Sequence, residues 1–189
     1  MSLQSTSSTL RQAIEVLDAR LVAADPAALA NQSPCDEWTG ADVVLHVARN
    51  LAGLSAALRG GDYRASTVQP GLDPRQAWAS ARERAVADLE AFDAHGVPDS
   101  PVRIGADTVT AEFLLVALVR DVTIHAWDLA RAVGGDDLLP ADLVEAVLAD
   151  MPAITAQMRG SGRYGSILPT PQDAGAQDRM LALAGRKAR

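Results

Sequence analysis

Apolar residues recur three or four positions apart along most of this chain, which is the spacing of an amphipathic helix. The first such segment covers roughly residues 8–24 and ends before Asp25-Pro26. Further segments with this period cover residues 39–58, 74–94, 110–133 and 140–158, and a short one lies within residues 173–186. The pattern predicts an all-α protein.

Residue types at the ends of these segments support the same boundaries. Thr39 followed by Asp42 is typical of a capping box, and Asp73 before Pro74 fits an N-cap followed by proline in the first turn. Gly134 fits a C-cap. Alanine and leucine dominate while aromatic residues make up 4 % of the chain, which favours helix over sheet. With 189 residues the chain is long enough to bury a core in one domain.

Charge and cysteine content exclude several classes of partner. Seventeen basic and twenty-four acidic residues give a net charge of -7, which argues against nucleic acid or an anionic membrane surface as the partner. The basic residues near the end, Arg186, Lys187 and Arg189, are interpreted as a frayed terminus. The lone Cys35, the absence of a signal-peptide pattern and the lack of a long apolar stretch predict a cytoplasmic protein.

The segment 117–131, ALVRDVTIHAWDLAR, places Asp121, His125 and Asp128 along one stripe of an otherwise apolar helix. Buried charges persist when they are paired or bind a metal, and an Asp four residues before a His lets both side chains reach one ion. His46 lies in a second apolar helical segment, VVLHVARNL. Two histidines and a carboxylate on two central helices match a metal site with three protein ligands and an open position.

Other interpretations of these residues remain open at this point. His125 could belong to a satisfied polar core in which it bonds Asp121 while Asp128 pairs with an arginine, and His46 could be structural. The acidic residues beside Cys35 disfavour a reactive thiolate, so a buried thiol or one in a turn is expected there. Trp38 and Trp127 are interpreted as packing residues, with the wall of a pocket as the alternative for one of them.

Three segments in order, SPCDEWTGADVVLHVARN, VRDVTIHAWDLARAVGG and AQDRMLALAGR, resemble the actinobacterial DinB-like metal-binding proteins related to mycothiol-dependent maleylpyruvate isomerase. The resemblance implies a DinB-like four-helix bundle with additional C-terminal helices. We expect a single domain over residues 1–189, with a core over about residues 5–158 and a tail with a short helix over residues 159–189.

The resemblance also implies a divalent metal, zinc or nickel, held by His46, Asp121 and His125. The family pattern has Glu where this chain has Asp121, which is one methylene shorter. Three arrangements are therefore open: Asp121 binds the ion directly after a helix shift, binds it through water, or leaves it with two firm ligands. Asp128 would orient an imidazole or pair with a nearby arginine.

The function expected from the resemblance is that of a metal- and mycothiol-dependent transferase or isomerase. The ion would activate the thiol of mycothiol or a similar low-molecular-weight thiol for transfer, conjugation or isomerisation on an electrophilic small molecule. Two alternatives use the same residues: a hydrolase with metal-bound water and Asp128 as base, or a helical scaffold that binds a metal or small molecule without chemistry. A homodimer is one option for the assembly.

Overall fold

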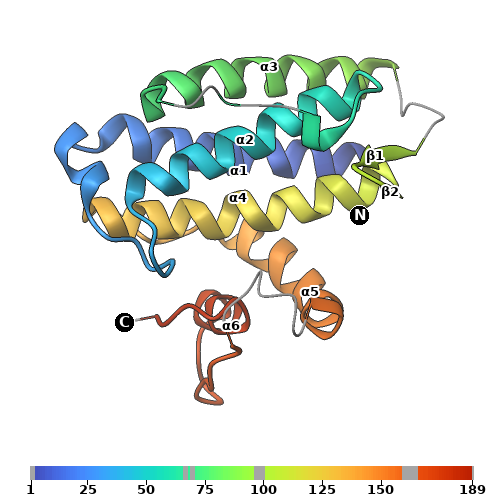
Figure 1. Ribbon diagram of the computed structural model, residues 1–189. Coiled ribbons are helices and arrows are strands. Elements are labelled where there is room, and N and C mark those ends of the chain that lie inside the picture. The colour runs from blue at the N-terminus through green and yellow to red at the C-terminus, as the bar shows by residue number, and fades with distance from the viewer. Residues whose placement is uncertain (1–2, 66–67, 69–70, 96–100, 159–165, 189) are drawn as a thin grey trace.

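Four long helices form the body of the protein and lie side by side (Figure 1). The computed structural model describes residues 3–65, 68, 71–95, 101–158 and 166–188. For residues 152–158 it describes the backbone and not the side chains. The four helices are α1 (Leu3–Ala23), α2 (Gly40–Leu58), α3 (Pro74–His95) and α4 (Ala111–Val133). Helix α1 packs mainly on α4 and α2 on α3, and α2 also contacts α4. The all-α bundle predicted from the sequence is therefore confirmed.

The shorter elements connect these helices or follow them. Two 3-10 helices, η1 (Pro26–Ala30) and η2 (Tyr63–Ala65), flank α2, and the strands β1 (Val102–Ile104) and β2 (Asp107–Val109) form an antiparallel hairpin before α4, with Val102 opposite Val109. Helices α5 (Ala141–Met158) and α6 (Ala176–Leu183) then extend from the α4 side of the bundle (Figure 1). Part of the predicted tail, residues 159–165, lies outside the described residues, and the proposed domain limits stay a prediction.

Local signals position the two helices that matter most for the site. The Thr39 hydroxyl accepts a hydrogen bond from the Asp42 amide at 3.2 Å, and the Asp42 carboxylate accepts one from the Thr39 amide at 2.9 Å. This capping box starts α2 as predicted. Helix α4 starts at an N-cap Thr110 and ends at Gly134, whose φ of 68° is the left-handed conformation that glycine adopts without strain.

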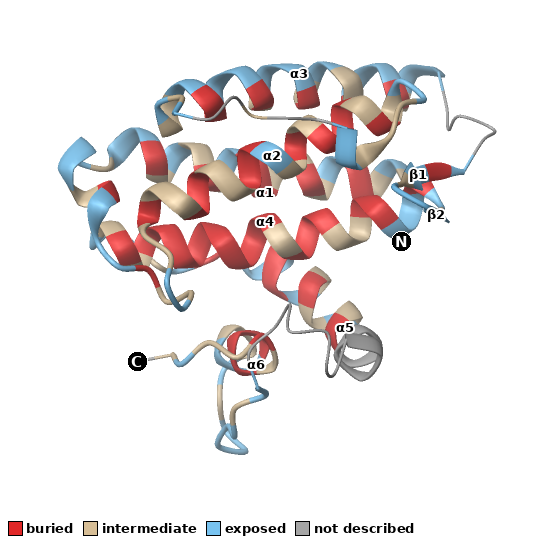
Figure 2. Ribbon diagram, viewed as in Figure 1, coloured by how far each residue is buried: buried red, intermediate tan, exposed pale blue. Residues whose placement is uncertain are grey.

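Helix α1 begins five residues earlier than the apolar period predicts, at Leu3. The reason is tertiary, because Thr6 and Ser7 are buried against the bundle and Ser7 donates a hydrogen bond to Asp93 at 3.2 Å. Apolar side chains of all four long helices fill the space between them, as the buried inward faces in Figure 2 show. The fully buried members include Leu10, Ile14, Leu17, Leu51, Leu54, Leu89, Leu115 and Leu129.

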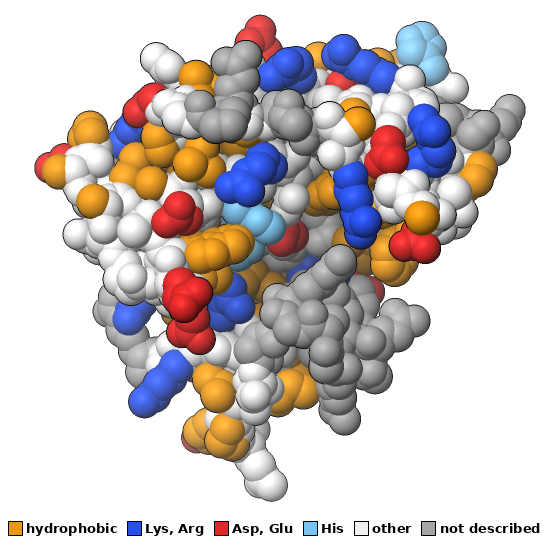
Figure 3. Space-filling view, viewed as in Figure 1, with side chains coloured by type: hydrophobic (Ala, Val, Ile, Leu, Met, Phe, Trp, Pro, Cys, Tyr) orange, Lys and Arg blue, Asp and Glu red, His pale blue; other side chains and the backbone are white. Residues whose placement is uncertain are grey.

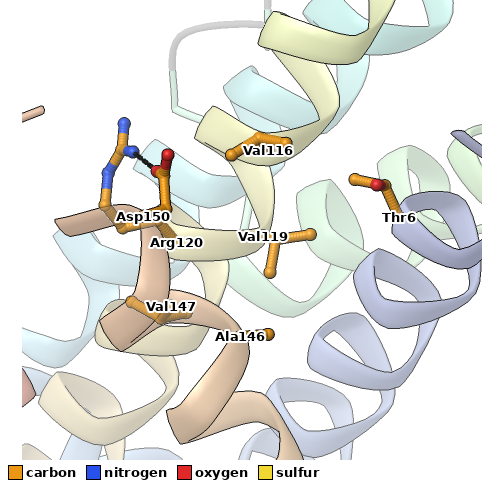
Figure 4. A pocket seen from close by; sticks show the side chains of 7 residues that line it. All are labelled: Thr6, Val116, Val119, Arg120, Ala146, Val147 and Asp150. Atoms are coloured by element: carbon orange, nitrogen blue, oxygen red, sulfur yellow. Dashed lines mark hydrogen bonds and ion pairs between the residues drawn. The ribbon is translucent and has the colours of Figure 1, made fainter. Parts of the chain in front are cut away.

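A partly buried ion pair joins α5 to α4. Arg120 on α4 is 4 % exposed and donates to Asp150 on α5 at 2.6 Å (Figure 4). Beside this pair is a cavity of about 20 Å³, lined by Val116, Val119 and Ala146 among others, which is large enough for about one water molecule. Among the described helices, none combines the length and the hydropathy needed to cross a bilayer.

Candidate metal centre

Helices α2 and α4 bring the three predicted ligands together. His46 on α2 and Asp121 on α4 are 75 positions apart in the sequence, yet His46 Nε2 lies 3.3 Å from Asp121 Oδ1. His125, one turn after Asp121, places its Nε2 3.6 Å from the same oxygen. One donor atom from each of the three residues lies within 4.8 Å of the other two. The structure thus places the predicted residues at a common point.

These spacings are suited to a bound metal ion. A tetrahedral ion with ligand distances of about 2.0–2.2 Å holds its donor atoms roughly 3.3–3.6 Å apart. The distances of 3.3 and 3.6 Å from Asp121 Oδ1 match that range, and the shorter one is also a long hydrogen bond between His46 and Asp121. Two imidazoles and a carboxylate are also a common ligand set of zinc. Asp121 Oδ1 lies within 3.6 Å of a ring nitrogen of each histidine.

One side of this centre is open. The side chains of His46 and Asp121 are 28 % and 24 % exposed, whereas that of His125 is 9 % exposed. In Figure 3 a histidine lies at the surface between α2 and α4, next to hydrophobic side chains and with an acidic group behind it. A ligand from solvent can therefore approach the centre from the side of His46 and Asp121.

Asn50 is a member of the site that the sequence analysis did not single out. It lies one turn after His46 on α2, and its Nδ2 donates to Asp121 Oδ2 at 2.9 Å. The same nitrogen lies 2.9 Å from His46 Nε2. Because Oδ2 is held by the amide, Oδ1 is the carboxylate oxygen that faces the two imidazoles. The spacing of four from His46 was the available signal, since it places Asn50 on the same helix face.

Asp128 supports His125 from the side away from the other ligands. Asp128 Oδ2 lies 2.9 Å from His125 Nδ1, and Asp128 is fully buried. Arg186 donates to both carboxylate oxygens, from Nε at 3.2 Å and from Nη2 at 2.9 Å. A histidine that binds a metal through one nitrogen usually donates its other N–H to such a carboxylate. The two contacts expected for Asp128, to an imidazole and to an arginine, are both present.

The interpretation of Arg186 as part of a frayed terminus is wrong. Its side chain is 11 % exposed, and its backbone amide donates to the carbonyl of Leu181 at 2.8 Å as the chain leaves α6. Arg186 follows Asp128 by 58 positions, so no local pattern could have paired them. The ion pair depends on where α6 packs, which the sequence period does not specify.

Cys35 lies in the turn that leads into α2, which is one of the two positions expected from the sequence. The turn closes with a hydrogen bond from the Trp38 amide to the Cys35 carbonyl at 3.1 Å, and Glu37 within it has a φ of 64°. Left-handed backbone is uncommon for a residue with a side chain. The acidic neighbours Asp36 and Glu37 are exposed, and Cys35 Sγ instead contacts Arg186 Nη2 at 2.6 Å.

Cys35, His125 and Asp128 form a second cluster of residue types that can bind metals. Cys35 Sγ lies 3.3 Å from Asp128 Oδ2. The Arg186 guanidinium contacts both groups and is itself a cation, so it takes the position that a metal ion would need. We therefore assign the candidate metal centre to the other side of the His125 ring, with His46 and Asp121.

Trp38 lies against both histidines of the site, in the position that the pocket-wall alternative describes. Its ring centroid lies 4.8 Å from that of His46 and 5.7 Å from that of His125, with its plane 25° from the plane of the latter. The two imidazoles are 4.8 Å apart and nearly perpendicular. The indole thus covers one side of the histidine pair.

The charges of the site depend on one another. Burial lowers the pKa of His125, but Asp121, Asp128 and Cys35 favour the charged ring and together raise its pKa to about 10. Burial raises the pKa of Asp121, but His125, His46 and Asn50 hold it well below its usual range. In the metal-free protein His125 is therefore protonated at neutral pH beside an ionised Asp121. A metal ion that binds at this point has to displace that proton.

The metal-free protein is expected to lose stability as the pH rises from about 6.5 to about 10. Because the His125 pKa is raised from 6.5 to about 10 on folding, the stabilisation is complete below the lower value and disappears as the pH passes the higher one. Melting temperatures by circular dichroism in the presence of a chelator should show this decline. His125→Gln should lack it, and equal declines in both proteins would contradict the assignment.

Comparisons with known proteins agree with this architecture. Crystal structures of the mycothiol-dependent maleylpyruvate isomerase and of a histidine-to-alanine mutant of it share the fold, with TM-scores of 0.63 and 0.65 at 23 % and 22 % sequence identity. Each comparison covers 89 % of this chain and 75 % of the isomerase chain.

Sequence comparison gives the family. The uncharacterized proteins Rv0738 and MT0763 of two Mycobacterium tuberculosis strains are each 29 % identical to this chain over 163 residues, which is 85 % of this chain and 86 % of theirs. The profile of the mycothiol maleylpyruvate isomerase N-terminal domain matches residues 10–130, from α1 through most of α4. The chain therefore belongs to the mycothiol maleylpyruvate isomerase N-terminal domain family.

Proposed function

We propose that this protein is an enzyme that binds a divalent metal ion, with zinc as the preferred candidate. The ion would activate mycothiol or a closely similar low-molecular-weight thiol. The observation that carries the proposal is the convergence of His46 Nε2, Asp121 Oδ1 and His125 Nε2 at spacings suited to one ion, on the open side of the bundle. The thiol is suggested by the family and by the name of the isomerase whose fold the chain shares.

When bound, the ion would supply the positive charge that deprotonates a coordinated thiol and so makes it nucleophilic at neutral pH. The residues of this chain supply the geometry. His46, Asp121 and His125 would hold the ion, and Asn50 keeps Asp121 Oδ1 turned toward it. Trp38 covers one face of the histidines. The thiolate would then attack an electrophilic small molecule in a transfer, conjugation or isomerisation.

The contacts of Asp128 argue against the hydrolase in which this residue acts as the base. Asp128 is fully buried, and its two oxygens are engaged by His125 and by Arg186. A base for a water molecule at the open position has to reach that water, either directly or through one other water. Asp128 lies on the opposite side of the His125 ring, so it supports the ligand and does not face the substrate.

Cobalt substitution tests the proposal directly. After metal analysis confirms loading, addition of mycothiol to the cobalt protein should produce a sulfur-to-metal charge-transfer band in the near ultraviolet. The apparent affinity should rise with pH until the free thiol is itself deprotonated, because coordination releases the thiol proton. S-methylated mycothiol, which keeps the sugar groups but has no free thiol, is the matched control and should give no such band.

Two variants refine this experiment. His46→Ala should lose the band because a ligand is missing, whereas Asp128→Ala should give a weaker or shifted band because only the support of His125 is disturbed. A fully loaded protein without any response to the thiol would contradict the proposal and favour the scaffold that binds without chemistry. A protein that takes up no cobalt would remove the metal centre as well.

A further inference from the structure

Arg186 lies just after α6, outside the residues that match the family profile, yet its guanidinium reaches the interior of the site. Nε and Nη2 donate to the two oxygens of Asp128 at 3.2 and 2.9 Å. Two parallel hydrogen bonds from the planar guanidinium fix the plane of a carboxylate, which a single contact does not do. Asp128 is fully buried, so this arrangement is also shielded from competition by water.

The plane of the Asp128 carboxylate matters because it determines how the His125 ring is held. Asp128 Oδ2 lies 2.9 Å from His125 Nδ1, so an N–H at that nitrogen is directed at the carboxylate. The opposite ring nitrogen, Nε2, then faces Asp121 Oδ1 at 3.6 Å. If the carboxylate could rotate, the ring would gain freedom to tilt away from the point shared with His46 and Asp121.

The guanidinium is itself fixed by neighbouring groups. Nη1 donates to the carbonyl of Ala184 at 2.9 Å, and Nη2 contacts Cys35 Sγ at 2.6 Å. Arg186 therefore connects three parts of the chain, namely the segment after α6, the turn before α2 and the buried Asp128 on α4. An arginine held in this way can transmit a fixed orientation to its partner.

We propose that Arg186 is a positioning residue of the metal centre, which through Asp128 fixes the His125 imidazole in the orientation that metal binding requires. The segment after α6 thereby completes a site whose ligands all lie in α2 and α4. This inference rests on the metal binding proposed above, and it assigns to this chain's own C-terminal segment a role in that site.

The first test measures cobalt affinity in Arg186→Gln. The variant should bind cobalt roughly tenfold more weakly, at the lower end of the about 10–100-fold effect of removing outer partners of a ligand. Its visible ligand-field bands should also shift, because the His125 ligand is no longer held at one angle. Arg179→Gln is the matched control, since Arg179 is an exposed arginine of α6 whose side chain donates to the Ala174 carbonyl.

A double-mutant cycle tests whether the effect passes through Asp128. In an Asp128→Asn background, Arg186→Gln should change cobalt affinity by less than about twofold, because the group through which it acts has already been altered. Arg186→Lys keeps the charge but not the two parallel hydrogen bonds, so it should restore only part of the affinity. If Arg186→Gln does not fold, Arg186→Lys replaces it in the comparison of cobalt affinity with the wild type.

A measurement on the metal-free protein separates this inference from the proposed function. With nitrogen-15 histidine labelling, His125 should show a protected Nδ1–H signal in the wild type and in Arg179→Gln, but a broadened or exchanged one in Arg186→Gln. Absence of cobalt binding by the wild type would defeat the proposed function while this signal still decides the role of Arg186. The inference would be overturned if Arg186→Gln showed the same His125 signal as the wild type. It would also be overturned if the wild type bound cobalt and Arg186→Gln bound it with the same affinity.

Discussion

Replacing His125 with alanine is expected to lower the zinc affinity of this protein by more than about 100-fold, because loss of a ligand should exceed the 10–100-fold loss seen when an outer partner is removed. The helical content should remain. The apolar faces of α1 to α4 form the core, and the fully buried leucines are contributed by all four helices. Calorimetric titration with zinc and far-ultraviolet circular dichroism measure the two effects separately.

The matched control is His95→Ala. His95 is the exposed last residue of α3 and is the only other histidine in the chain besides His46 and His125. Its replacement should leave zinc affinity unchanged. If a chelator melted the wild-type fold, the metal would be structural, and the enzyme proposal would lose support to the scaffold.

Asp128→Asn is expected to have the largest effect on stability. Asp128 is fully buried between His125 and the Arg186 guanidinium, so the substitution removes the negative charge that both cations share. Breaking a buried ion pair by changing one partner costs about 3–5 kcal/mol of the free energy of unfolding. The metal-free protein should lose that amount in chemical denaturation. Zinc affinity should fall by about 10–100-fold because His125 loses its acceptor.

Asp88→Asn provides the comparison for Asp128→Asn. Asp88 pairs with Arg59, whose side chain is 62 % exposed, and such surface ion pairs contribute about 0–1 kcal/mol. The two variants make the same chemical change at a fully buried aspartate and at one that is 13 % exposed and pairs with an exposed arginine. Equal losses of unfolding free energy in both would show that the buried ion pair of Asp128 stabilises the fold no more than the pair of Asp88 does.

Local sequence determined the helices of the bundle and the three central residues of the site. Thr39, Thr110 and Gly134 stop or start helices through hydrogen bonds within a few residues, and apolar residues repeat with the helical period. Asp121 and His125 share a face because they are four residues apart on α4. A charged pair within an apolar helix, together with a histidine in a second apolar helix, was therefore enough to indicate three residues that the fold brings together.

Only the tertiary structure decided how that site is supported. Arg186 is 151 positions from Cys35 and 58 from Asp128, and Trp38 reaches the two histidines through a turn with an unusual backbone conformation at Glu37. Contacts of this kind follow from the packing of α6 and from the path of the turn before α2, which leave no period in the sequence. Their energies depend on exclusion of water, and burial of an ion pair is decided only when distant segments come together.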